Sequence, residues 1–549
     1  MPPRGSPVDS GGMDPRRRCW PTITALLSAV VLGLGGLAAD QSPAAMSANL
    51  IGGPFARLLA ESTDLGPTDA PQVQITAELN RPAEPVRLID WSADRGLSVR
   101  WRAGDPWAIV EGRPRAVADA FGVAVHDYRA GRGPEPGRVF YASPQQPGIP
   151  APVTAEVAGL GRILSYTPYR EGRPPVPPRD VPDGGLLPNQ LLSAYNVTSL
   201  ADDGYTGKGS TVVVFSFDGF DQKDMDSFAD WFDLPRFTPQ VLGGMPERNG
   251  GESTMDLQMI HAIAPDARLV MVNARPTVEG GQAYEKLGRL MESVDRRFRG
   301  AIWSFSIGWG CDRLLTAADL APVRSALAMA HRHGTTAFDA TGNMAGLECR
   351  GGKNWSDPPS TDDIGVDAVA SLPEMTAVGG TTLSTDVNGR WLAEQAWYDV
   401  PLTQGTAGGA SVLFGRPAWQ DVGAAAGPPG RRLVPDIAAV ADPFTGVKFV
   451  FQQQIVVGGG TSQAAPVWAG LAAVINQLLA EENLKPLGDL NPLLYQVAKG
   501  SAVPGFHGID LGGNAISPSV SGYDMVTGLG SPNVENLVQN ILLIRSVRR

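Results

Sequence analysis

Residues 458–466 read Gly-Gly-Gly-Thr-Ser-Gln-Ala-Ala-Pro and lie between two segments of different hydrophobic pattern. The apolar runs 448–451 and 455–457 before this stretch are typical of strands, and the run 467–475 after it is typical of a buried helix. The glycines allow a tight turn and the close approach of another backbone. The sequence therefore predicts a strand-to-helix turn that places Ser462 at a helix N-terminus.

This turn has two interpretations. Free N–H groups and the helix dipole at an N-terminus stabilise an anion, which is what an acyl-transfer serine requires. Alternatively, the stretch is a Gly-rich turn in which Thr461 or Ser462 only caps the helix. A short motif does not separate the two, so the decision depends on partner residues elsewhere in the chain.

Strands and helices alternate over much of the chain. Continuous apolar strands between helical patterns predict a doubly wound α/β fold with a mainly parallel sheet. Active sites of such sheets gather at the carboxyl ends of the strands. The candidate strands are 210–217, 269–273, 301–307, 335–340 and 375–379, and the candidate helices between them include 255–263, 282–296 and 322–333.

The chain of 549 residues is too long for one simple core and divides into four segments. Residues 1–45 contain three consecutive arginines, at 16–18, followed by an apolar stretch and predict an export signal or a membrane anchor. Residues 46–165 predict a small α+β domain with strands near 73–79, 97–101 and 108–112. Residues 166–189 carry seven prolines and predict an extended, protease-accessible linker, and residues 190–549 hold the alternating pattern.

Charge and composition exclude some classes of function. The net charge of −11 and the lack of a basic stripe argue against a nucleic-acid partner. The five histidines show no zincin spacing, which disfavours a zinc hydrolase. Of three cysteines, Cys19 lies in the export segment, so Cys311 and Cys349 remain as an even pair. They can form a disulfide in an oxidising compartment, with free buried thiols as the alternative.

Two carboxylates, Glu252 and Asp256, are four residues apart at the start of a helical pattern. This spacing puts them on one face of a helix. Like charges so close raise the pKa of one of them, which gives a carboxylate able to accept a proton. The alternative is an ordinary solvated helix start, where the helix dipole favours acidic residues.

These motifs occur together in one order and resemble the sedolisin family of serine-carboxyl peptidases from about residue 70 to about residue 535. The resemblance implies a subtilisin-like fold preceded by an α+β propeptide, in a secreted proenzyme that hydrolyses peptide bonds. Peptide or protein substrates and its own propeptide are the implied partners, in a secreted or cell-envelope location. The motifs are Glu252-x-x-x-Asp256, His261-Ala262-Ile263-Ala264-Pro265, Ser306-x-x-Trp309-Gly310, Gly459-Gly460-Thr461-Ser462-x-x-x-Pro466 and the tail 522–532.

The resemblance also implies a role for each matching residue. Ser462 is the expected nucleophile that forms the acyl-enzyme, and Glu252 is its general base and later the acid for the leaving amine. Asp256 orients Glu252 and couples to it electrostatically, and Trp309 supports the carboxylates. The family has an aspartate at the oxyanion position, where this chain has Asn343. Because an amide donates at every pH, we expect Asn343 to extend activity toward neutral pH.

Two further positions depart from the family pattern. Ser216 stands where the family often has a supporting glutamate, and Asp218 lies two residues on. In the tail, Asp524 matches one calcium carboxylate, but the other aligns with Gly508. Since calcium prefers six or more oxygens, usually from several carboxylates, we expect a calcium site that is weakened or is rescued by Asp510. The expected ligands are Ile509, Asp510, Val520, Gly522 and Asp524.

Two alternatives to an active serine-carboxyl peptidase stay open from the sequence. The departures at Ser216, Asn343 and Gly508 are consistent with a degenerate secreted homologue that acts as a binding protein. A subtilisin-type enzyme shares the fold and the serine motif but needs a histidine in a Gly-His-Gly-Thr setting, which the sequence lacks. His261 is expected to be a packed histidine instead.

Overall fold

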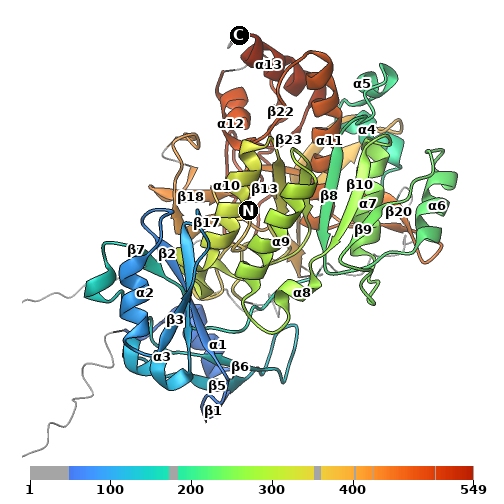
Figure 1. Cartoon of the computed structure of the whole chain (residues 1–549). Helices are drawn as coiled ribbons and strands as arrows, with labels where there is room; N and C mark the ends of the chain where they lie inside the picture. Colours follow the sequence, from blue (N-terminus) through green and yellow to red (C-terminus); the bar gives the residue numbers. More distant parts are fainter. Residues whose placement is uncertain are drawn as a thin grey trace, which may run out of the picture. The chain divides into compact units, whose positions relative to one another are not determined.

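The computed structural model describes residues 49–171, 184–350, 360–400, 403–423, 426–500 and 503–547. Figure 1 shows their helices and strands. The predicted export segment 1–45, with Cys19, and residues 172–183 of the predicted Pro-rich linker lie outside the described residues.

The larger part is built on an eight-stranded sheet with strand order β14-β13-β12-β11-β8-β10-β9, in which β19 also pairs with β13. Among these pairs only β13 and β14 run antiparallel. The prediction of a doubly wound, mainly parallel sheet is therefore confirmed. The strands are β8 Thr211–Ser216, β9 Gln240–Leu242, β10 Arg268–Asn273, β11 Ile302–Phe305, β12 Thr336–Ala340, β13 Thr376–Thr385, β14 Trp391–Ala396 and β19 Ile437–Val440.

Helices cover both faces of this sheet. Successive side chains of a strand point to opposite faces, and in β8 Val212 and Val214 join the core that contains α7 (Glu252–Ile263) and α11 (Thr461–Glu481). Val213 and Phe215 join the core that contains α9 (Ala283–Arg297) and α10 (Ala321–Arg332). Because both faces are buried, these strands read as continuous apolar runs in the sequence.

Helix α11 is the one helix of the described part that is long and apolar enough to cross a membrane. Of its most apolar window, 89% is buried inside the protein. It is the central helix of a core, which explains its apolar composition.

Residues 49–160 form a smaller α+β part with its own apolar core. Strands β3-β4-β2-β7 make an antiparallel sheet, and β1-β5-β6 make a second one. The helix at 114–121 ends at Gly122, whose φ of 65° suits glycine. The elements are α1 Gly53–Ala60, β1 Thr63–Pro67, β2 Val73–Leu79, α2 Val86–Ala93, β3 Leu97–Arg100, β4 Trp107–Gly112, α3 Pro114–Phe121, β5 His126–Arg129, β6 Val139–Ala142 and β7 Val157–Leu160.

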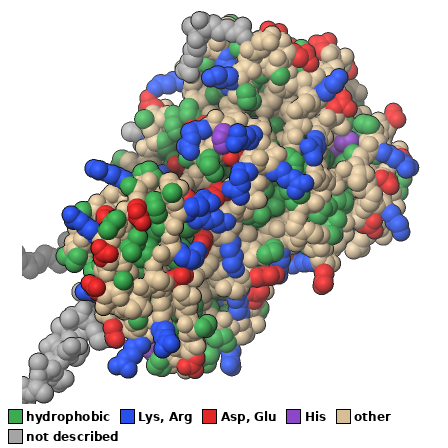
Figure 2. All heavy atoms as spheres, viewed as in Figure 1, with side chains coloured by type: hydrophobic (Ala, Val, Ile, Leu, Met, Phe, Trp, Pro, Cys, Tyr) green, Lys and Arg blue, Asp and Glu red, His purple; other side chains and the backbone are tan. Residues whose placement is uncertain are grey.

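Ion pairs join the smaller part to α9. Arg100 pairs with Glu285 at 2.7 Å, and Arg102 pairs with the nearly buried Glu292 at 2.7 Å. Figure 2 shows basic and acidic side chains interspersed over one face of the molecule.

The remaining elements connect and close the larger part. They are α4 Pro188–Ala194, α5 Thr198–Asp202, α6 Gln222–Trp231, α8 Arg275–Val278, β15 Tyr398–Asp399, β16 Gln404–Gly405, β17 Gly409–Gly415, β18 Arg431–Val434, β20 Lys448–Phe451, β21 Gln454–Val457, α12 Asn491–Gly500, β22 Phe506–His507, β23 Ser531–Pro532 and α13 Val534–Val547.

Candidate active site

Ser462 is the second residue of α11 and lies at the N-terminal end of this buried helix. Gly460, just before the helix, has a φ of 83°, so the turn requires glycine there. Pro466 has no N–H, which leaves the carbonyl of Ser462 open within the helix. That carbonyl lies 3.1 Å from Ser306 Oγ, and Ser462 Oγ lies 3.5 Å from the carbonyl oxygen of Ser306. The turn after β21 thus holds Ser462 against the loop that follows β11.

Glu252 and Asp256 are buried one helical turn apart at the start of α7. Burial raises the pKa of Glu252 to about 8, while the nearby Ser462 hydroxyl lowers it and the negative charge of Asp218 raises it. Burial also raises the pKa of Asp256 well above its ordinary value, and the charge of Glu252 adds to this. Asp256 Oδ1 lies 2.9 Å from Ser306 Oγ. The structure therefore brings the two carboxyl groups and Ser462 together.

Asp218 fixes the N-terminus of α7. It follows β8 at the carboxyl end of the sheet, and its Oδ2 accepts the N–H groups of Gly250 at 2.7 Å and Glu252 at 3.1 Å. The Ser253 hydroxyl lies 2.6 Å from both the Asp218 carbonyl oxygen and Ser216 Oγ. Asp218 thus acts on Glu252 and Asp256 through the position of the helix and through its charge. The sequence raised Asp218 only as a replacement for the family's glutamate, which is missing at Ser216.

Asn343 lies in the loop after β12 and touches the turn that carries Ser462. Its Oδ1 accepts the backbone N–H of Thr461 at 2.8 Å and the Thr461 hydroxyl at 3.1 Å. Because a backbone N–H can only donate, this contact fixes which end of the amide is oxygen and leaves Nδ2 as the free donor group. Asn343 and Ser462 line one cleft of about 630 Å³.

Trp309 is fully buried beside the site. Its ring packs edge-on against Phe217, with ring centroids 5.4 Å apart, and its backbone N–H donates to Asp367 at 2.5 Å. Its carbonyl accepts the hydroxyl of Tyr284 at 2.7 Å. Trp309 therefore contacts Phe217, the residue immediately before Asp218, and supports the acidic side chains of the site through this contact.

His261 lies at the far end of α7 and has partners of its own. A ring nitrogen is 2.7 Å from the carbonyl oxygen of Pro235, and the ring stacks on Phe237 at 3.7 Å. Burial lowers the pKa of His261 to about 4. These contacts agree with the expectation of a packed histidine.

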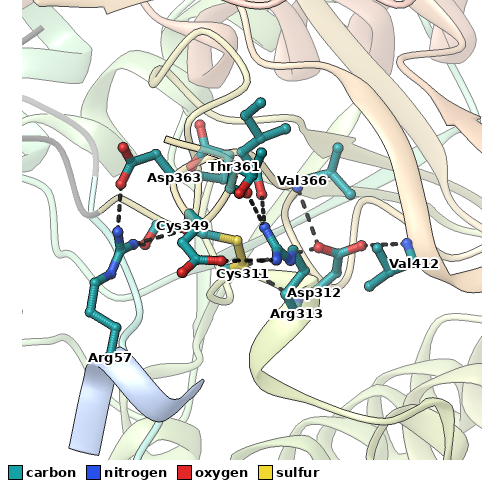
Figure 3. Close-up of a disulfide and its surroundings, with 12 residues drawn as sticks. Arg57, Cys311, Asp312, Arg313, Cys349, Thr361, Asp363, Val366 and Val412 are labelled. Atoms are coloured by element: carbon teal, nitrogen blue, oxygen red, sulfur yellow. Dashed lines mark hydrogen bonds and ion pairs between the residues drawn. A yellow bond between two sulfur atoms is a disulfide. The ribbon is translucent and has the colours of Figure 1, made fainter. Parts of the chain in front are cut away.

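Cys311 and Cys349 form a disulfide with their Cα atoms 4.9 Å apart. Cys311 follows the Ser306 loop and Cys349 follows the Asn343 loop, so the bond ties together two loops that line the cleft. Figure 3 shows Arg57, from the smaller part, reaching Asp363 at 2.6 Å and the Cys349 carbonyl oxygen at 2.7 Å.

The expected calcium residues lie in the tail between β22 and β23. Asp524 is buried, and its oxygens accept the N–H groups of Val520, Val526 and Thr527 at 2.7–3.1 Å. Ile509 is buried, whereas Asp510 and Gly522 are exposed. The residues present supply one buried carboxylate whose oxygens already close the loop, so they fit calcium incompletely.

The doubly wound sheet brings the helix N-terminal serine, two buried carboxyl groups and an amide donor to one edge. This is the arrangement of a serine-type hydrolase. Kumamolisin from Bacillus sp. (strain MN-32) is 30% identical over 465 residues, which cover 79% of this chain and 78% of kumamolisin. The chain belongs to the sedolisin family of serine-carboxyl peptidases.

Further comparisons agree with this membership. Sedolisin from Pseudomonas sp. (strain 101) is 27% identical over 381 residues, covering 64% of this chain and 60% of sedolisin. The structure of Pseudomonas sedolisin complexed with two molecules of pseudo-iodotyrostatin matches with a TM-score of 0.54 and 26% identity, over 65% of this chain and 98% of that chain. No model of a protein family matches the chain. The chain is therefore a serine-type peptidase that acts on peptide or protein substrates.

Proposed function

We propose that this peptidase is made as a secreted proenzyme and cleaves peptide bonds through an acyl-enzyme on Ser462, with Glu252 as general base. The observation that carries the proposal is that the Ser306 hydroxyl lies 2.9 Å from Asp256, one helical turn from Glu252, and 3.1 Å from the carbonyl oxygen of Ser462 at the N-terminus of α11. Glu252 takes the hydroxyl proton as Ser462 attacks the carbonyl carbon and then returns it to the leaving amine. Water hydrolyses the ester in a second cycle of the same proton transfers.

Asp256 supports Glu252 in its protonated, neutral form. The Ser306 hydroxyl has one proton to donate and two partners within reach, Asp256 and the carbonyl oxygen of Ser462. The carbonyl oxygen can only accept, so it must receive the Ser306 proton. Both contacts are satisfied when Asp256 donates to Ser306 and Ser306 donates to Ser462. The raised pKa of Asp256 supports this assignment. A neutral Asp256 leaves the negative charge to Glu252, the group that must accept the proton.

Asn343 Nδ2 is the proposed donor to the oxyanion. Replacing Asn343 by Asp is expected to move the alkaline limb of the kcat/KM profile to lower pH, because a carboxyl group donates only while it is protonated. Asn343→Ala should lower kcat by about 10²- to 10³-fold at all pH values. Initial rates on a quenched fluorescent peptide from about pH 3 to about pH 8 measure both effects. If the kcat/KM profiles of the wild type and Asn343→Asp have the same alkaline limb, Asn343 is not the oxyanion donor.

The region 46–165 is the proposed propeptide, joined by a processing linker at 166–189 to the peptidase region 190–549. The ion pairs of Arg100 and Arg102 with α9 support a part that docks on the peptidase region. The basic and apolar pattern of residues 1–45 and the disulfide support export to an oxidising compartment. Retention of that apolar segment would anchor the protein to a membrane.

Calcium binding in the tail is proposed to be weak because Gly508 supplies no carboxylate. A Cβ atom at Gly508 would have no heavy atom within 4 Å, so a larger side chain fits. Addition of about 10 mM calcium should raise Tm by about 1 °C in the wild type and by about 3 °C in Gly508→Asp. Gly508→Asn is the uncharged control and should match the wild type. Equal calcium responses of the Asp and Asn variants would contradict a calcium site at this position.

A further inference from the structure

We propose that the cleft selects peptides in which an arginine and a glutamate occupy consecutive positions on the N-terminal side of the cleaved bond, with Glu348 as the residue that determines the arginine preference. This inference rests on the proposed function of the cleft and names its substrate class.

Residues 168–171 occupy the cleft in the manner of a substrate strand. The N–H of Arg170 donates to the Gly308 carbonyl at 2.8 Å, and the N–H of Gly308 donates to the Arg170 carbonyl at 3.1 Å. An added strand held by such reciprocal bonds is a common mode of peptide recognition. Gly308 is two residues beyond Ser306, whose carbonyl contacts Ser462 Oγ. The paired strand therefore lies next to the proposed nucleophile.

The direction in which residues 168–171 run shows on which side of a cleaved bond Arg170 and Glu171 lie. Glu171, the residue after Arg170, lines a small cavity together with Glu252 and Ser306. The chain thus approaches the catalytic groups as its residue number rises. Arg170 and Glu171 consequently occupy the part of the cleft that receives residues N-terminal to a cleaved bond.

Glu348 receives the arginine. Its side chain is 5% exposed and forms an ion pair with Arg170, and its backbone carbonyl accepts a second hydrogen bond from the same guanidinium. The other carboxylate oxygen accepts the N–H of Met344 at 2.9 Å, one residue after Asn343. A planar guanidinium matches this paired set of acceptors better than an ammonium does.

Release of the segment that carries Arg170 would leave without its cation the Glu348 carboxylate, whose side chain is only 5% exposed while Arg170 is bound. A buried charge that has lost its partner is unfavourable, so the emptied pocket favours a substrate that returns a guanidinium. A neutral side chain of the same shape would leave the carboxylate unpaired. Selection at this position therefore follows from burial as well as from charge.

Glu171 is held by two arginines. It forms ion pairs with Arg248 and Arg275, whose side chains are 53% and 29% exposed. Exposed ion pairs are weakened by solvent screening. We therefore expect the preference for glutamate to be weaker than the preference for arginine.

The test compares peptides that differ by one charge. The processed enzyme is given two fluorogenic peptides with Arg-Glu or citrulline-Glu before the cleaved bond, since citrulline is a neutral analogue of arginine. The wild type should show a kcat/KM ratio of about 30 or more in favour of arginine. Glu348→Gln should lower this ratio to about 3 or less, because Gln keeps an acceptor for Met344 and loses the charge. Glu374→Gln, which changes a carboxylate paired with Arg324, should keep the wild-type ratio.

Each outcome decides between the alternatives. The inference is overturned if the wild type has an arginine-to-citrulline kcat/KM ratio near one, or if Glu348→Gln leaves this ratio unchanged. A general loss of activity in the variant does not matter, because it lowers kcat/KM for both peptides equally. If the variant does not fold, the wild-type ratio alone decides. Cleavage of both peptides at equal rates refutes the subsite and leaves the proposed function intact. No Ser462-dependent cleavage of any peptide refutes the proposed function itself.

Discussion

Replacement of Ser462 by alanine is expected to lower kcat for peptide hydrolysis by about 10⁴- to 10⁶-fold, because the acyl-enzyme can no longer form. The surrounding groups should stay in place, since alanine keeps the backbone carbonyl that faces Ser306. Substrate affinity should change little. Hydrolysis of a fluorescent peptide by the purified chain measures the loss.

A matched control separates this loss from damage to the fold. Ser199 is exposed on α5, so Ser199→Ala should keep wild-type activity. If the proenzyme processes itself, Ser462→Ala should also remain at full length by intact mass while the control is shortened. Activity of Ser462→Ala within tenfold of the wild type would exclude Ser462 as the nucleophile.

Replacement of Glu252 by glutamine is expected to lower kcat by about 10⁴-fold with little change in KM, because the amide cannot accept the hydroxyl proton. The amide is nearly isosteric with the carboxyl group and fits the same buried position at the start of α7. Steady-state kinetics on one peptide separate kcat from KM. A change confined to KM would indicate a binding role instead.

The same substitution should also change how stability depends on pH. A carboxyl group whose pKa is raised from 4.5 to about 8 holds its proton more tightly in the folded chain than in the unfolded one. Its stabilising contribution is complete below about pH 4.5 and is lost as pH rises toward about 8. Glutamine does not titrate, so the variant should lose less free energy of unfolding over this window.

Denaturant unfolding of the full chain, compared in the Ser462→Ala background to prevent self-digestion, measures this difference. Burial also raises the pKa of Asp367 to about 7 and of Asp312 to about 6, and both titrate in the same direction. They are present with and without the Glu252→Gln change, so the difference between the two proteins reports Glu252 together with Asp256, whose pKa the charge of Glu252 raises. Equal pH slopes would show that Glu252 has no raised pKa in the folded chain.

Several features of the fold follow from local patterns. The apolar strands between helices predict the parallel sheet, and β8, β10, β11, β12 and β13 occur where they are expected. The edge strands β9 and β14 were not predicted, because short or half-exposed strands have no continuous apolar run. The expected strand 301–307 ends at Phe305, because Ser306 leaves the sheet to face Asp256 and Ser462.

The smaller part was predicted less completely. Its strands β2, β3 and β4 show alternation and were expected. The four-residue strands β5, β6 and β7 lack the alternation of apolar and polar residues that marks β3, a strand of the same length. Their pairing depends on neighbours distant in the chain, such as Thr63 with Arg129.

By itself, the sequence determined the doubly wound class, the turn that carries Ser462 and the four-residue spacing of Glu252 and Asp256, because each depends on residues adjacent in the chain. Only the tertiary structure decided how these groups meet. The orientation of Asn343 depends on Thr461, 118 residues away, and the pairing of Arg170 with Glu348 spans 178 residues. The high pKa of Glu252 depends on burial beneath segments that no local pattern places there. Contacts of this kind arise when the chain packs, so their chemistry can be stated only after the fold is known.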